Sequence, residues 1–330
     1  MQILLDILLF LVGLVVIIKG ADWLTDGASR IAAHFGIPSL VIGLTIVAFG
    51  SSAPEFVVSV VSAVHGNCDM ALGNIVGSNI FNILGIMGIT AVIYPIKVER
   101  SNVRYDVPFV ILSSVVIAIT ALDPILNSSG EGVISRNEGL LMLCMFAIFM
   151  SYTFSITNTS SVPTKDEEAT PRSSQGSGTS LLRSSLLFIA GLAGLIFGAD
   201  WIVDGATGMA KAIGISDAVI ALTVVSIGTS TPELASSIMA ARKGDTGLAL
   251  GNIVGSAVFN VFFVLGTCST ILPLGIGGVS HIDIAFLLFG SVLFYMLCSF
   301  GKEKLTLTRA EGAVMVLCIT AYYSWLIYNA

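Results

Sequence analysis

Ten long apolar runs, separated by short polar breaks, are the feature that most limits what this chain can fold into. Only 11% of its 330 residues are charged, whereas a soluble domain carries about 25%. The runs are continuously apolar and do not alternate as barrel strands do, so they indicate membrane-spanning helices. We predict an all-α membrane protein with spans over residues 3–18, 37–64, 70–96, 107–122, 139–157, 181–203, 215–241, 247–274, 282–300 and 310–328.

The distribution of basic residues predicts the orientation of these spans. If the N-terminus lies outside, the inside loops hold 13 of the 15 Lys and Arg residues, and the outside loops hold only Arg136 and Lys211. Loops on the cytoplasmic side of a membrane are enriched in Lys and Arg. We therefore expect both termini on the non-cytoplasmic side, in the inner (cell) membrane of a bacterium.

The chain also repeats itself at an offset of 178 residues. Residues 20–82 align without gaps to residues 198–260, with 32 identities in 63 positions. Five spans fall in each half, and an odd number inverts the second half relative to the first. We expect two inverted-topology repeats of five helices, 1–154 and 181–330, an architecture of secondary transporters. The Ser-, Thr- and Pro-rich stretch 155–180 is predicted to be a flexible cytoplasmic linker.

Each repeat places one glutamate, Glu55 or Glu233, in the middle of an apolar run and directly after a proline. Proline removes a backbone donor and should break the helix at that point. A broken helix at membrane depth occurs only where it lines a cavity, and an ionised carboxylate there costs about 2.5–3.5 kcal/mol. No Lys, Arg or His lies in the runs around the glutamates. Two such carboxylates therefore predict a bound cation.

A second polar element follows in each repeat. Asn74, Ser78 and Asn82 are spaced at i, i+4 and i+8, which places them on one helix face. Asn252, Ser256 and Asn260 repeat the pattern. Carboxylate, amide, hydroxyl and carbonyl oxygens are ligands for Ca²⁺ and Na⁺ rather than Zn²⁺ or Cu⁺.

These motifs resemble those of a known family. Gly50-Ser-Ser-Ala-Pro-Glu55 and Gly228-Thr-Ser-Thr-Pro-Glu233, each followed by Gly-Asn-Ile-Val-Gly-Ser and Phe-Asn, are similar to the α-repeats of prokaryotic sodium/calcium exchangers of the cation/calcium antiporter superfamily. The α-repeats here would cover about 37–96 and 215–274. The resemblance implies Ca²⁺ ligands at Glu55, Glu233, Ser51 and Thr229, Na⁺ ligands at Ser52, Ser78, Ser230, Ser256 and the carbonyls of Ala48 and Ser226, and a middle completed by Asn82 and Asn260.

The implied function is antiport of Ca²⁺ against Na⁺ by alternating access. The family usually moves three Na⁺ per Ca²⁺, which would make exchange electrogenic. Ca²⁺ and Na⁺ are then substrates, no prosthetic group or enzymatic activity is expected, and the bilayer rather than nucleic acid surrounds the protein. A monomer is compatible with the sequence.

Several alternatives stay open at this point. Asn260 stands where some family members carry Asp, which makes potassium co-transport less favoured. A Ca²⁺/H⁺ antiporter or an exchanger of another divalent cation is the nearest rival function. A channel would use similar oxygens, but inverted repeats with broken helices favour alternating access over a continuous pore.

Overall fold

The computed structural model describes residues 2–121, 132–159, 181–212, 226–276, 279–300 and 305–329. Nearly all of this part of the chain is helical. The helices of the first half are α1 (Gln2–Phe35), α2 (Ser39–Ile42), η1 (Gly43–Val47), α3 (Ala48–Ser51), α4 (Ala53–Val64), α5 (Cys68–Ile80), η2 (Phe81–Ile86), α6 (Met87–Ile93), η3 (Asn102–Asp106), α7 (Val107–Ala121) and α9 (Arg136–Thr159). Those of the second half are α10 (Leu181–Ala212), α12 (Ser226–Thr229), α13 (Thr231–Arg242), α14 (Thr246–Val258), η5 (Phe259–Leu265), α15 (Gly266–Ile271), α16 (His281–Phe300) and α17 (Arg309–Asn329).

The all-α membrane fold expected from the apolar runs is confirmed. Seven described helices have the length and hydropathy of a membrane span, and the bent pair Ser39–Ser51 and Ala53–Val64 makes an eighth. Of the remaining predicted spans, α17 is a helix of 21 residues, and much of the run 215–241 lies outside the described residues. The total of ten spans stays a prediction.

Two expected boundaries differ from the structure. The first span was expected over 3–18, but α1 continues to Phe35. The added part keeps one apolar helix face although polar residues interrupt the run. The buried residues of that face are Ala21, Leu24, Ala28 and Ala32. At the predicted linker, residues 155–159 belong to α9, and 160–180 lie outside the described residues.

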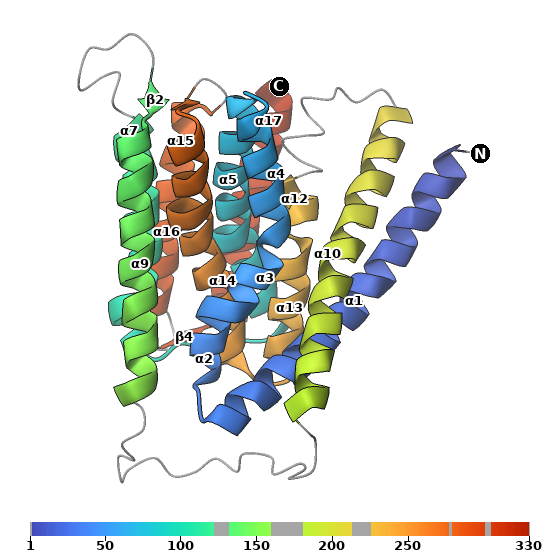
Figure 1. Ribbon diagram of the computed structural model, residues 1–330, viewed down its shortest axis with the longest axis vertical. Helices are drawn as coiled ribbons and strands as arrows, with labels where there is room; N and C mark the ends of the chain where they lie inside the picture. Colours follow the sequence, from blue (N-terminus) through green and yellow to red (C-terminus); the bar gives the residue numbers. More distant parts are fainter. Residues whose placement is uncertain are drawn as a thin grey trace.

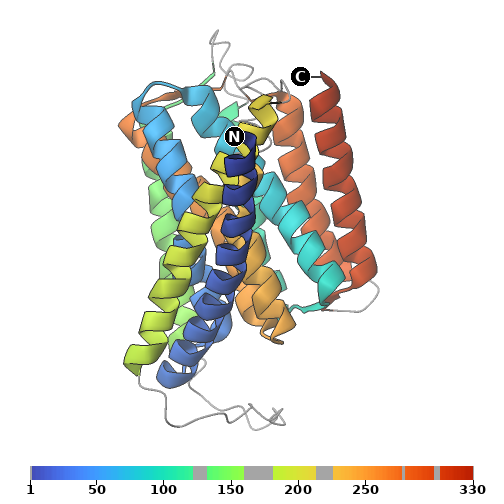
Figure 2. The same cartoon turned by 90° about the vertical axis from the view of Figure 1, so that its right-hand side faces the viewer.

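Helix α1 runs antiparallel to α10, and the two form a tilted pair at the side of the molecule (Figure 1). Figure 2 shows the same pair crossing in front of the other helices. Glycines let the backbones touch: a Cβ atom at Gly20 would lie 2.9 Å from the Gly191 carbonyl, and one at Gly13 would lie 2.8 Å from that of Gly198. Small residues are therefore required along this contact.

The centre of the molecule is built from two equivalent spans. In the span Cys68–Ile93, 83% of the most apolar segment is buried, and in Thr246–Ile271 the figure is 94%. The corresponding figures for the spans that begin at Leu4 and Leu181 are only 28% and 22%. The two central spans, which carry the Asn and Ser stripes, therefore form the core, and α1 and α10 form its edge.

Four two-residue strands join the halves of the described chain. β1 (Ile96–Lys97) pairs antiparallel with β4 (Thr306–Leu307), and β2 (Val133–Ile134) pairs with β3 (Leu274–Gly275). β1 and β3 are equivalent in the internal repeat, since they follow the two central spans at the 178-residue offset. In Figure 1, β2 lies at the upper end of the molecule and β4 at the lower end. Equivalent elements of the two halves thus lie at opposite ends.

Candidate cation-binding site

Both glutamate-bearing helices break where the prolines predict. Ser52 separates α3 from α4 with φ −82° and ψ 10°, and Ser230 separates α12 from α13 with φ −86° and ψ 5°. The axis bends by 48° at the first break. Because Pro54 and Pro232 have no N–H group, the carbonyls four residues earlier lose their usual helical donor. Each broken span therefore continues as a new helix, α4 or α13, that begins next to its glutamate.

Glu55 and Glu233 lie in the first turns of α4 and α13 and are fully buried, each with 0% exposure. A helix N-terminus carries a partial positive charge, which favours a carboxylate in this position. The contacts cross between the repeats. Ser230 Oγ donates to Glu55 Oε1 at 2.8 Å, and Ser52 Oγ donates to Glu233 Oε1 at 2.6 Å. Each repeat therefore holds the carboxylate of the other.

No ion pair between described residues involves either glutamate, since the ion pairs found join Lys243 to Asp22 and Asp26. The second carboxylate oxygens, Oε2 of Glu55 and Oε2 of Glu233, have no hydrogen-bond donor among the described residues. A buried ionised carboxylate needs a counter-charge or a proton. Each of the two carboxylates therefore requires either a bound cation or a proton in this position.

The predicted Asn and Ser stripes lie on helices that contact the glutamate-bearing helices α4 and α13. All of their members are buried, at 6% exposure or less. Ser256 Oγ reaches Glu233 Oε1 at 3.4 Å. Asn82 and Asn260 make no such contact, and each lies in a π-helical segment, η2 or η5. The sequence does not indicate these segments. π-bulges are rare and are frequent at functional sites.

Asn74 and Asn252 connect the stripes to the broken helices. Asn252 Nδ2 donates to Ser236 Oγ at 2.9 Å and Ser237 Oγ at 2.8 Å, and Asn252 Oδ1 accepts from Ser51 Oγ at 3.1 Å. In the other repeat, Asn74 Nδ2 donates to Ser59 Oγ at 3.0 Å, and Asn74 Oδ1 accepts from Thr229 Oγ1 at 3.5 Å. Sequence reasoning grouped these two amides with the other oxygen ligands. Through the bonds from Ser51 and Thr229, these amides also clamp the two repeats together.

The carbonyls of Ala48 and Ser226 lie one turn before the breaks. Ala48 O accepts from Ser52 N at 3.0 Å and from Ser51 Oγ at 3.4 Å. Ser226 O accepts from Ser230 N at 3.4 Å and from Thr229 Oγ1 at 3.2 Å. These carbonyls accept bonds within their own helices, whereas the Ser51 and Thr229 hydroxyls also reach across to the other repeat.

Most of the buried polar side-chain atoms without a hydrogen-bond partner in the described chain belong to the predicted site residues. Of thirteen such side-chain atoms among the described residues, eight belong to predicted site residues. They are Glu55 Oε2, Glu233 Oε2, Ser78 Oγ, Ser226 Oγ and both amide atoms of Asn82 and of Asn260. Buried polar groups are normally hydrogen-bonded, so a cluster of exceptions requires an explanation. Cations held by these oxygens would provide one.

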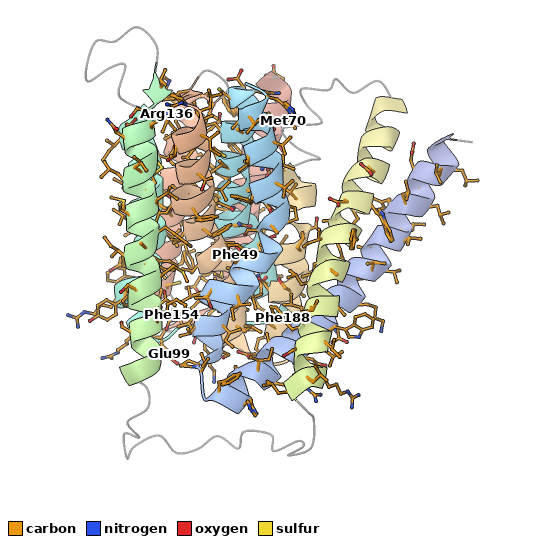
Figure 3. The ribbon with its side chains drawn as sticks, in the orientation of Figure 1. Phe49, Met70, Glu99, Arg136, Phe154 and Phe188 are labelled. Atoms are coloured by element: carbon orange, nitrogen blue, oxygen red, sulfur yellow. The ribbon has the colours of Figure 1, made fainter. Side chains whose placement is uncertain are left out.

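A separate apolar cavity of about 300 Å³ lies beside this centre, between α3, α9, α10 and η5. Phe49, Phe154 and Phe188, labelled in Figure 3, contribute to it from three different helices. Its lining contains no carboxylate. The cavity therefore borders the predicted site at Ala48 but does not contain its carboxylates. No group of three or more His, Cys, Asp or Glu side chains suited to a metal occurs among the described residues.

Fold and centre together define an integral membrane protein with two buried carboxylates inside a shell of neutral oxygens. The sequence matches the family model described as sodium/calcium exchanger protein over residues 5–155 and 183–328. The putative antiporter CaxA of Alkalimonas amylolytica is 36% identical over 94% of this chain and 95% of its own. The sodium/calcium exchanger MaX1 of Methanosarcina acetivorans is 30% identical over 98% and 99%.

A solved structure agrees with these relatives. The sodium-calcium exchanger NCX_Mj, soaked with 10 mM Na⁺ and without Ca²⁺, superposes with a TM-score of 0.81 at 29% identity, covering 98% of this chain and 99% of that one. The chain belongs to the sodium/calcium exchanger family. It is an integral membrane transporter of the cation/Ca²⁺ antiporter kind.

Proposed function

We propose that this chain exchanges Ca²⁺ for Na⁺ by alternating access at one site shared by the two repeats. Glu55 and Glu233 are the central ligands, and Ser51 and Thr229 complete the Ca²⁺ shell. Na⁺ occupies flanking positions formed by Ser52, Ser78, Ser230 and Ser256 with the carbonyls of Ala48 and Ser226. Asn82 and Asn260 face the middle of the site.

One observation carries this proposal: buried polar atoms without partners lie on helices that contact α4 and α13, whose two carboxylates have no basic partner among the described residues. Ca²⁺ takes six to eight oxygen ligands, including carboxylates and carbonyls, which matches this set. Both ions need the same two carboxylates, so they compete. One Ca²⁺ balances two carboxylates, whereas three Na⁺ leave one net positive charge. Each net charge moved across the membrane is worth about 2.3 kcal/mol per 100 mV.

We also propose that the repeats, 1–154 and 181–330, are inverted and together form ten spans. The placement of β2–β3 and β1–β4 at opposite ends supports inversion. The start of α1 and the end of α17 lie at the same end in Figure 1, as an even number of spans requires. With both termini on the non-cytoplasmic side, the 155–180 linker is cytoplasmic.

Alternating access requires a part that moves, and the α1–α10 pair is suited to it. The pair lies at the edge of the molecule, and its two helices contact each other through glycines. It also crosses the broken helices, since a Cβ at Gly50 would meet the Leu192 side chain of α10 at 2.6 Å. We propose that sliding or rocking of this pair exposes the site to each side in turn.

Purified protein in proteoliposomes tests this function. Vesicles loaded with Na⁺ and diluted into Na⁺-free buffer containing ⁴⁵Ca²⁺ should take up Ca²⁺, and an Na⁺ ionophore should abolish the uptake. An inside-negative potential should slow Ca²⁺ entry, because more positive charge leaves than enters. Uptake that ignores Na⁺ but follows a pH gradient would establish the Ca²⁺/H⁺ alternative. Uptake of Mg²⁺ or Mn²⁺ in preference to Ca²⁺ would establish another divalent substrate.

A further inference from the structure

Ser226 has a buried hydroxyl that, unlike most buried hydroxyls in the described part of this protein, makes no hydrogen bond. The residue begins α12 and is 1% exposed. Several buried hydroxyls bond back to their own helix, as Ser113 does to Val110 O at 2.8 Å and Thr153 does to Phe149 O at 2.9 Å. Ser226 Oγ has no hydrogen-bond partner in the described part of the chain. An unpaired buried hydroxyl costs about 1–3 kcal/mol.

The Ser226 hydroxyl points toward the central span α5. A Cβ atom built on Gly77 would lie 2.9 Å from Ser226 Oγ but 3.7 Å from Ser226 Cβ, so the oxygen is the nearer atom. Gly77 directly precedes Ser78, whose hydroxyl is also buried and unpartnered. The Ser226 hydroxyl thus reaches α5 of the other repeat at Gly77, one residue before the second unpartnered hydroxyl in the sequence.

The internal repeat shows that this oxygen is present on one side only. Ala48 occupies the position equivalent to Ser226, and Gly255 the position equivalent to Gly77. There a Cβ at Gly255 would lie 2.7 Å from both Ala48 Cβ and the Leu44 carbonyl oxygen, so no side-chain oxygen faces this glycine. The glycine lies closer to the Cβ atom on the Ala48 side, 2.7 Å against 3.7 Å at Ser226, and the second repeat alone supplies a side-chain hydroxyl. The two flanks of the acidic centre are therefore chemically unequal.

We propose that the Ser226 hydroxyl is a direct Na⁺ ligand. The Na⁺ position beside Ser78 and Ser226 then binds Na⁺ more tightly than the equivalent position beside Ser256 and Ala48. This inference rests on the proposed exchange function and adds a side-chain oxygen to the backbone carbonyl already assigned. Ser226 lies three residues before Thr229, so its hydroxyl is about 4.5 Å farther along the helix than the central Ca²⁺ ligands. Neutral oxygens at this distance from the carboxylates suit a monovalent ion better than Ca²⁺, whose shells draw on carboxylates.

Ser226→Ala tests the assignment. The half-saturating Na⁺ concentration for Na⁺-driven Ca²⁺ uptake should rise about 3- to 10-fold, the size of effect expected for one lost ligand bond. Half-saturation by Ca²⁺, measured as Ca²⁺/Ca²⁺ exchange without Na⁺, should change less than about twofold. Ser113→Ala removes a buried hydroxyl on α7 and should change neither value. Ala48→Ser adds the oxygen to the opposite flank and should lower the Na⁺ requirement.

An unchanged Na⁺ dependence in Ser226→Ala would overturn the inference, and so would an equal shift for Na⁺ and Ca²⁺, which indicates a structural role. If the unmodified protein shows no Na⁺-dependent exchange, the proposed function fails instead. Na⁺-induced thermal stabilisation of the purified protein then decides the inference separately. Ser226→Ala should need more Na⁺ for the same stabilisation, and identical Na⁺ titrations of the two proteins would contradict the assignment.

Discussion

Ser52 Oγ donates a hydrogen bond of 2.6 Å to Glu233 Oε1, so a hydroxyl of the first repeat positions the carboxylate of the second. Ser52→Ala removes both this bond and one proposed Na⁺ ligand. Hydrogen bonds to charged groups contribute about 1.5–3 kcal/mol, so the half-saturating Na⁺ concentration should rise at least about tenfold. Ser52→Thr keeps the hydroxyl and should restore most of the affinity. Equal Na⁺ dependence in the Ala and Thr variants would show that the hydroxyl is not used.

The two clamping amides should differ in their importance for stability. Asn252 Nδ2 has three acceptors within 3.3 Å, Glu233 O, Ser236 Oγ and Ser237 Oγ. Asn74 Nδ2 donates to Ser59 Oγ, and Val58 stands where the second repeat has Ser236. Asn252→Ala should therefore lower the thermal midpoint in detergent more than Asn74→Ala, by a margin of about 1–2 kcal/mol. Equal losses would show that the extra acceptors contribute nothing.

Close contact within the α1–α10 pair predicts a sharp glycine requirement. A Cβ at Gly191 would lie 2.4 Å from Leu24 N, a backbone atom that cannot move aside alone. Gly191→Ala should destabilise the protein by about 1–3 kcal/mol, as overpacking does, and reduce exchange with it. Gly275→Ala is the matched control, since a Cβ there would have no neighbour within 4 Å. Normal folding and exchange by Gly191→Ala would exclude a tight glycine contact.

Lys243 joins the end of α13 to α1. Its Nζ donates to Asp26 Oδ1 at 2.9 Å and also pairs with Asp22, and all three side chains are partly exposed. Exposed ion pairs contribute about 0–1 kcal/mol, so Lys243→Met should hardly change the thermal midpoint. If the α1–α10 pair moves against α13, losing this link should still speed exchange. Unchanged turnover would show that this ion pairing does not restrain the proposed movement.

Local rules predicted the broken helices correctly, because proline acts on the chain within one turn of its own position. The cross-repeat contacts could not be predicted in the same way. Ser52 and Glu233 are 181 positions apart, so the sequence indicates both residues without showing that they are partners. The π-helical segments that carry Asn82 and Asn260 were also missed, since a shift in helical hydrogen bonding has no distinct apolar period.

The length of α1 shows a related limit of hydropathy. The apolar run ends at the charged residues Lys19, Asp22 and Asp26. A prediction of membrane spans from hydropathy therefore places the end of the first span near Ile18. The helix continues because its buried face is made of residues spaced for packing against neighbouring helices rather than against lipid. Hydropathy predicts which residues suit a membrane core, whereas helix ends depend on packing and caps. Gly36, with φ 64°, provides the actual stop.

Direct Ca²⁺ binding tests the central claim, that Glu55 and Glu233 form one site shared by both ions. Calorimetric titration of the purified protein with Ca²⁺ should show saturable binding that Na⁺ displaces competitively and with a steep dependence on Na⁺ concentration. Glu55→Gln and Glu233→Gln should each abolish this binding. Glu138→Gln, which keeps the helix-capping contact with Ser135, should bind normally. Retained Ca²⁺ binding in either site variant, or Ca²⁺ binding indifferent to Na⁺, would contradict the account.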